Sequence, residues 1–121
     1  MNSMFTKHYN KIKGNLGEKL ALNYVKKTLK YKLIQTNFKN NIGEIDIIAK
    51  DKNILVFIEV KYRSSDLYGL PREAVTKQKQ NKIKLVATSY LKKENLLDNI
   101  EVRFDVIDIL NDEVTYIKDA F

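Results

Sequence analysis

The hydrophobic and polar positions along the chain follow two different periods, which predict helices and strands in a definite order. In residues 15–29 apolar side chains recur at the helical spacing of about 100° per residue and form an arc without lysine. A second helical pattern covers residues 71–92, with the only proline at its entry. Strand patterns rich in Ile and Val cover residues 31–38, 43–49, 54–63, 100–109 and 114–117.

The predicted order is therefore a helix, three strands, a second helix and two strands. Elements in this order form an α/β domain, with a mixed central sheet flanked by helices. The length of 121 residues favours a single domain over residues 1–121. We expect the polar turn 50–53 to join the second and third strands as a hairpin, with Asp51 and Lys52 at its tip.

Strand alternation gathers charged residues on one face of this hairpin. Glu44 and Asp46 share a face of their strand, and Glu59 and Lys61 share a face of the next. The opposite face of the first of these strands carries Ile45, Ile47 and Ala49. With the expected tip, Glu44 faces Glu59 and Asp46 lies diagonal to Glu59. All four charged groups therefore converge on one side, and only a bulge or a one-residue slip would separate them.

Three carboxylates beside one lysine stabilise a sheet poorly, because like charges placed opposite each other repel. Such groups suit a hard divalent cation, which prefers carboxylate oxygens and keeps several waters for substrate phosphates. The alternative is an edge strand laced with salt bridges, in which Lys61 is the counter-ion.

Glu18 is a further acid in an unexpected position, within the apolar arc of the first helix. Buried carboxylates are rare unless they are paired or bound to metal. Glu18 either joins such a site, or pairs with a lysine, or lies at the helix start where the helix dipole favours an acid.

The lysines are concentrated in the first half of the chain. Residues 1–61 carry 12 Lys and 5 Asp or Glu, which accounts for the whole formal net charge of +7. Four of these lysines lie on the helix arc opposite the apolar one, namely Lys19, Lys26, Lys27 and Lys30. Clustered lysines indicate a surface for nucleic-acid backbones. A solvated face or an anionic membrane surface would use the same lysines.

Composition excludes several classes of site. With no Cys and one His, the chain has no disulfide, no thiol nucleophile and no metal cage of nitrogen or sulfur ligands. No apolar run reaches membrane-spanning length, and residues 1–13 lack the apolar segment of a secretory signal. We therefore expect a cytoplasmic protein without a membrane partner.

Gly43-Glu44-Ile45-Asp46 followed by Glu59-Val60-Lys61 resembles the acidic motif of the PD-(D/E)XK nucleases, the restriction-endonuclease-like superfamily. Ile45 stands where the superfamily motif has proline. The resemblance covers nearly the whole chain and extends through Gly17-Glu18 with Ala21, residues 57–63, 69–75 and 79–83, Arg103-Phe104-Asp105, and Ala120-Phe121. Together these segments resemble the YraN-like family of small bacterial proteins, described as predicted endonucleases related to Holliday-junction resolvases.

The resemblance implies a restriction-endonuclease-like αβββαβ core and a role for each matching residue. Asp46 and Glu59 match the ligands of Mg²⁺ or Mn²⁺, and Lys61 matches the lysine that orients or activates the attacking water. Glu18 matches the extra acid that many members supply from the first helix. The remaining candidates are Glu44 as an additional ligand or a partner of Lys61, and Gln80 and Arg63 as contacts to the substrate.

The leading prediction is metal-dependent phosphodiester hydrolysis of nucleic acid by an endonuclease, for which branched or structured DNA is favoured as the substrate and RNA stays open. Cutting both strands of a junction needs two sites, so a homodimer is compatible with this activity. Two other classes stay open: a non-catalytic nucleic-acid-binding module with the same fold, and a protein-interaction domain whose charges are structural. The complete set of Asp46, Glu59 and Lys61 favours the enzyme, because binding alone does not need all three.

Overall fold

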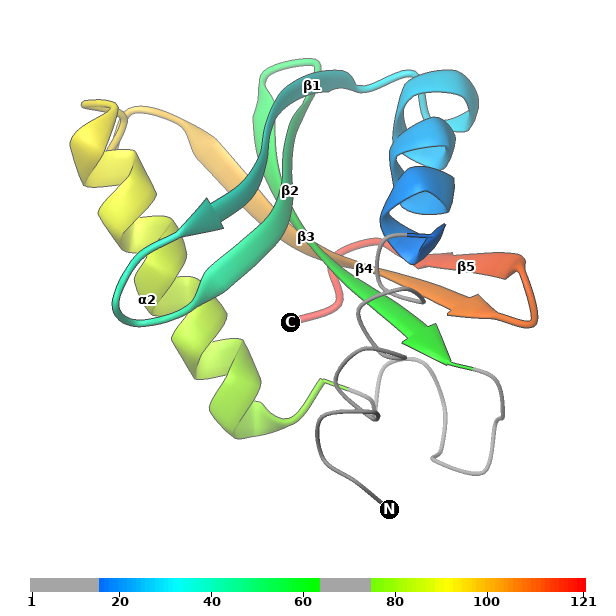
Figure 1. Ribbon diagram of the computed structural model, residues 1–121. Coiled ribbons are helices and arrows are strands. Elements are labelled where there is room, and N and C mark those ends of the chain that lie inside the picture. Colours follow the sequence, from blue (N-terminus) through cyan, green and yellow to red (C-terminus); the bar gives the residue numbers. More distant parts are fainter. Residues whose placement is uncertain (1–15, 64–74) are drawn as a thin grey trace.

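The computed structural model describes residues 16–63 and 75–121, which build one sheet with a helix on each face (Figure 1). The first helix comprises residues 16–28, of which 16–23 are α-helical and the rest form the π-helical turn η1. The elements in chain order are η1 (Tyr24–Thr28), β1 (Lys32–Lys39), β2 (Glu44–Asp51), β3 (Ile54–Arg63), α2 (Lys77–Lys93), β4 (Glu101–Leu110) and β5 (Glu113–Ile117). Within these residues, no helix combines the length and the apolar character needed to cross a membrane.

The five strands lie in the order β1-β2-β3-β4-β5. β3 and β4 are parallel and joined through α2, whereas the other neighbours are antiparallel. A parallel pair needs such a crossover, because a short turn can only join antiparallel strands. The mixed sheet and the αβββαβ order predicted from the sequence are therefore confirmed.

α2 begins later than the sequence pattern predicts. Its first residue is Lys77, and the Thr76 hydroxyl accepts the backbone N–H of Lys79 at 3.2 Å, which caps the helix. Val75 is buried just before the helix rather than within it. Pro71, the predicted entry, lies outside the described residues.

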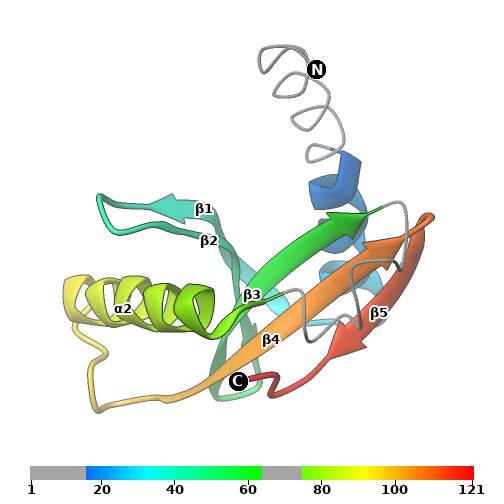
Figure 2. The same cartoon turned by 90° about the horizontal axis from the view of Figure 1, so that it is seen from below.

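The two faces of the sheet carry separate apolar cores. One core joins α2 to the sheet and includes Ile48, Leu55, Phe57, Val106, Ile83, Val86 and Tyr90. The other joins the first helix to the opposite face and includes Ala21, Val25, Ile47, Ala49, Val56, Ile58 and Ile107. Figure 2 shows the two helices on opposite sides of the sheet. Since alternate residues of β3 share a face, Glu59 and Lys61 lie on the α2 face with Phe57.

The β2–β3 hairpin has a different register from the predicted one. Asp51 pairs with Ile54, so Lys52 and Asn53 form the turn, and Lys52 adopts a φ of 57°. The predicted tip of Asp51 and Lys52 is therefore wrong by one residue. The pairing runs from Asp51–Ile54 to Ile47–Ile58, and its change of two leaves every side chain of β3 on its predicted face.

The start of β2 departs from simple alternation. Ile45 was expected beside Ile47, yet it packs with Phe38 in the α2 core while Ile47 packs in the other core. β2 bends toward α2 here, since a Cβ built on Gly43 would lie 3.5 Å from Cγ2 of Val86. Figure 2 shows the β1–β2 pair alongside α2. This bend brings the acidic end of β2 to the helix.

The first helix is held against the end of β3 at its own beginning. Gly17 is buried, and a Cβ at this position would lie 2.6 Å from Cδ2 of Tyr62. Only a residue without a side chain allows this approach. Glu18, the next residue, therefore lies at a helix end that is close to the carboxyl end of β3.

Candidate active site

Four charged side chains from three elements meet on the α2 face of the sheet. We call them the acid–lysine cluster: Asp46 on β2, Glu59 and Lys61 on β3, and Lys79 on α2. Oδ2 of Asp46 accepts the backbone N–H of Val60 at 2.8 Å. Glu59 is only 6% exposed, and its Oε1 lies 2.8 Å from Nζ of Lys79. The structure thus brings together the three residues predicted to act together, and it adds Lys79.

The electrostatics of Asp46 indicate a deficit of positive charge. Burial, followed by the negative charge of Glu59, raises the pKa of Asp46 from 3.8 to about 7. Glu44 raises this pKa further, whereas the hydrogen bond from Val60 and the charge of Lys79 lower it. Two carboxylates in one site cannot both ionise easily without a further cation.

The two lysines of the cluster differ in their tendency to hold a proton. Burial, and then the hydrogen bond and positive charge of Lys79, lower the pKa of Lys61. Burial also acts to lower the pKa of Lys79, but the charge and hydrogen bond of Glu59, together with the contributions of Lys61 and Asp46, outweigh burial and raise the pKa. Lys79 therefore stays an ammonium against Glu59, and Lys61 is the amine better able to exchange a proton.

Sequence reasoning assigned Lys79 no role at the site. Its contact with Glu59 is made across the α2–sheet interface, and strand alternation carries no information about that interface. The sequence did indicate a role for Lys79 in one way: the residue lies within segment 79–83, one of the segments that carry the family resemblance.

Asp46 and Glu59 are the residues that fit a divalent cation. Mg²⁺ commonly binds one or two protein carboxylates and completes its shell with water and phosphate. The Lys79 ammonium already stands where Glu59 attracts positive charge. Among the residues that the structure describes, no group of three or more His, Cys, Asp or Glu side chains is arranged to hold a metal. The protein would therefore supply two carboxylates, and water and substrate would supply the other ligands.

Glu44 and Glu18, the other predicted acids, lie differently. Glu44 is exposed at the start of β2, acts on the charge of Asp46, and lines a small hollow with Lys79 and Lys82. Glu18 is half-buried on the first helix and is not among the main groups that shift the pKa of Asp46. Glu44 thus borders the cluster, and Glu18 lies outside its principal interactions.

Arg63 and Gln80 are engaged within the protein. Nε of Arg63 donates to Oδ1 of Asp108 at 2.9 Å and Nη2 donates to Oδ2 at 3.2 Å. Asp108 is paired with Lys61 in the β3–β4 register, so this buried ion pair adjoins the cluster. The Gln80 amide donates to the carbonyl of Val75 at 3.0 Å and fixes the entry into α2.

The predicted basic face of the first helix does not adjoin the acids. Its lysines are exposed, and the helix covers the sheet face opposite α2; they are Lys19, Lys26, Lys27 and Lys30. α2 supplies a second set near the acids: Lys79 belongs to the cluster, and Lys82 lines the hollow that Glu44 and Lys79 share. Residues 62–121 carry equal numbers of basic and acidic side chains, so their net charge gave no indication of this set.

A separate polar network is buried on the first-helix face. Nε of Arg103 donates to Oδ1 of Asp105 at 3.0 Å, and Nη1 donates to Asp51 at 3.0 Å. Nη2 donates to the Tyr31 hydroxyl at 2.9 Å, and the Tyr116 hydroxyl donates to Asp105. Arg103 is 8% exposed and Asp105 is fully buried. The network therefore ties Tyr31, the residue before β1, to β2, β4 and β5.

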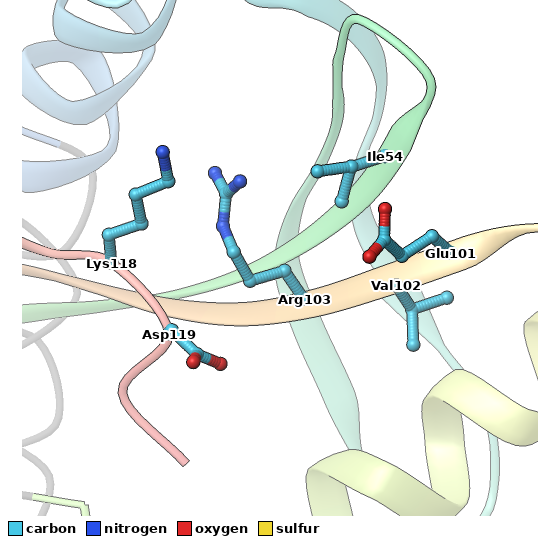
Figure 3. Close-up of a pocket in the computed structure, with 6 residues that line it drawn as sticks. All are labelled: Ile54, Glu101, Val102, Arg103, Lys118 and Asp119. Atoms are coloured by element: carbon cyan, nitrogen blue, oxygen red, sulfur yellow. The ribbon is translucent and has the colours of Figure 1, made fainter.

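A hollow of about 400 Å³ lies beside Arg103 (Figure 3), lined by Ile54, Glu101, Val102, Arg103, Lys118 and Asp119. It lies at the amino ends of β3 and β4, whereas Glu59 and Lys61 lie toward the carboxyl end of β3. The Arg103 guanidinium is engaged by Asp105 and Asp51. This hollow is therefore distinct from the acid–lysine cluster.

We expect Asp46 to make the metal-free protein less stable as the pH rises from about 4 to 7. The folded-state pKa of about 7 exceeds the ordinary value of 3.8. In this window the folded state holds a proton that the unfolded chain releases, so stability falls with pH and levels off above it. Asp46→Asn keeps an acceptor for Val60 and removes the charge.

Urea unfolding in EDTA across this pH range measures the effect. The stability gained by Asp46→Asn over wild type should grow as the pH rises. Glu113→Gln, an exposed acid on β5, is the matched control and should show no such trend. Parallel stability curves for Asp46→Asn and wild type would show that Asp46 is not perturbed in this way.

Comparison with known proteins places the chain in a family. The model of the uncharacterised protein family UPF0102 matches residues 17–109. A UPF0102 protein of Clostridium botulinum (strain Hall) is 47% identical over 121 aligned residues, covering 94% of this chain and 98% of that protein. A UPF0102 protein of Clostridium beijerinckii is 46% identical over 121 residues, covering 95% and 97%. The chain therefore belongs to the UPF0102 family, the YraN-like family that its motifs resemble.

Proposed function

We propose that this protein is a metal-dependent endonuclease that hydrolyses phosphodiester bonds in DNA. The observation that carries the proposal is the acid–lysine cluster: two neighbouring carboxylates, Asp46 and Glu59, with Lys61 beside them on the same face. The UPF0102 family is uncharacterised, so the activity is inferred from the site.

Each residue of the cluster has a defined task in this reaction. Asp46 and Glu59 would hold Mg²⁺ or Mn²⁺, which polarises a phosphoryl oxygen when bound. Lys61 orients the attacking water, and its lowered pKa makes it the lysine of the cluster better able to take a proton from that water. Lys79 remains charged and adds positive potential that attracts the phosphate. A cytoplasmic location, predicted from the sequence, would give access to this substrate.

A non-catalytic nucleic-acid-binding module is the second candidate function. The observation that favours it is the ion pair between Lys79 and Glu59, which neutralises one of the two carboxylates without any metal. In that case α2 would supply phosphate contacts and the acids would only order the helix.

A cleavage panel separates these two functions. Single-stranded, duplex, flap and four-way-junction DNA, with matching RNA, would be incubated with the full chain in Mg²⁺, Mn²⁺, Ca²⁺ or EDTA. The proposed endonuclease cleaves DNA in Mg²⁺ or Mn²⁺ and not in EDTA, and it prefers branched substrates. Cleavage of both strands of a junction would support a homodimer. Binding in Ca²⁺ without cleavage in any metal would favour the binding module.

We expect α2 to bind more of the substrate phosphates than the first helix does. Reversing Lys77 and Lys82 to Glu should make the logarithmic salt dependence of binding shallower by roughly 0.7–0.9 for each phosphate that the protein no longer neutralises. Reversing Lys26 and Lys27 should change it less, because these side chains lie on the other face of the sheet. Titrations at several salt concentrations measure both slopes. A larger change for the first-helix pair would contradict a substrate path along α2.

A further inference from the structure

Lys79 directly contacts a residue expected to hold the metal. Its Nζ lies 2.8 Å from Oε1 of Glu59, a side chain that is 6% exposed, whereas Lys79 itself is 42% exposed. The buried partner is therefore a fixed carboxylate on the sheet, and the cation is a long side chain that reaches it from α2. A pair of this kind can separate by movement of the lysine alone.

A divalent cation at Glu59 and the present position of Lys79 oppose each other. The Lys79 ammonium and the divalent cation would both lie within a few Å of the same carboxylate, and like charges this close to each other repel strongly. Lys79 has space to withdraw, since a hollow of about 290 Å³ beside it is lined by Thr76, Gln78, Lys79 and Lys82. Glu59 has no such freedom, because it is buried within β3.

We infer that Lys79 is the counter-ion of Glu59 in the metal-free protein and that a divalent cation binds by displacing its ammonium. Lys79 is then a positioning residue that sets the metal affinity of the cluster. This inference rests on the proposed function, because it takes Glu59 to be a metal ligand.

Direct binding of Mn²⁺ to the full chain, without nucleic acid, tests the inference. Removing the competing charge in Lys79→Met should tighten Mn²⁺ binding by roughly tenfold, as expected for a unit charge next to a divalent ion. Lys79→Gln should behave in the same way. Lys82→Met is the matched control: it removes the same charge from the same exposed helix surface and should change the affinity by less than about twofold.

Melting temperatures provide a readout that a purely structural ion pair would not give. In EDTA, Lys79→Met should melt below wild type because Glu59 is left buried without its partner. Saturating Mg²⁺ should close this gap, because the metal replaces the ammonium in both proteins. A gap that persists unchanged in Mg²⁺ would assign Lys79 a structural role and overturn the inference.

Mn²⁺ binding by wild type and by Lys79→Met distinguishes a failure of this inference from a failure of the proposed function. If wild type binds Mn²⁺ and Lys79→Met binds it equally or more weakly, Lys79 does not compete with the metal, while the metal site stands. If neither wild type nor any variant binds Mn²⁺, the metal site itself is wrong and the inference falls with it.

Discussion

Lys61→Ala should lower the rate of phosphodiester cleavage by about 10²–10³. The expectation follows from the typical cost of removing one preorganised group that stabilises a transition state. Lys61 is half-buried beside Asp46 and Glu59, so water cannot readily replace its ammonium or amine at the same point. Single-turnover cleavage of a saturating substrate measures the chemical step without a contribution from binding.

Two controls make the Lys61 result specific. Lys84→Ala removes an exposed lysine from α2 and should leave the rate within about threefold of wild type. Mn²⁺ binding by Lys61→Ala should be retained, since Lys61 is not one of the proposed ligands. In wild type the rate should rise with pH as Lys61 releases its proton, and Lys61→Arg should lose that rise. Full activity of Lys61→Ala would refute the assignment of its role.

Asp105→Ala should destabilise the protein by about 3–5 kcal/mol, the usual cost of breaking a buried ion pair from one side. Asp105 is fully buried, and its two oxygens accept from Arg103, from the Tyr116 hydroxyl and from the backbone N–H of Asp119. Its removal leaves the guanidinium of Arg103 with Asp51 as its remaining carboxylate. Urea unfolding monitored by circular dichroism measures the decrease in stability.

A double variant distinguishes the pair from simple packing. Arg103→Met combined with Asp105→Leu removes the guanidinium together with Asp105 and should cost less stability than Asp105→Ala alone, because no buried cation is left without its main partner. An exposed acid, Glu101→Ala on the same strand, should cost less than about 0.5 kcal/mol. A decrease below about 1 kcal/mol for Asp105→Ala would show that the network does not hold the strands together.

The sequence was sufficient for the order of elements and for the faces of β3 and β4. The period of apolar residues in β3 and β4 fixes which side chains are buried, and this pattern placed Glu59 and Lys61 together correctly. The hairpin tip was less well determined. Moving the turn by one residue changes the pairing by two and leaves the same side chains on each face, so the apolar pattern fits both turns. Lys52 also adopts a positive φ, which a lysine in the sequence does not predict.

Features that depend on packing between elements were not predictable from periodicity. At the start of β2, Ile45 packs in the α2 core and Gly43 lies in contact range of Val86 on α2. The contact of Lys79 with Glu59 depends on where α2 crosses the sheet. Alternation within a strand describes neither relation.

The position of the first-helix lysines relative to the acids was likewise not predictable from periodicity. Helical periodicity placed them correctly on the exposed arc, opposite Ala21 and Val25. It could not tell that this helix and the acid–lysine cluster occupy opposite faces of the sheet. Charge counted along the chain is therefore a poor guide to which lysines adjoin the acids.

The central claim is that Asp46 and Glu59 form the metal site of a nuclease, and cleavage by their isosteric variants tests it most directly. Wild type, Asp46→Asn and Glu59→Gln would be compared in one assay with Mg²⁺ on the preferred DNA substrate. We predict cleavage by wild type and a rate reduced by at least about 10³ in both variants, with binding of the same DNA retained. Cleavage by either variant at the wild-type rate would contradict the claim and leave these two acids with a structural role.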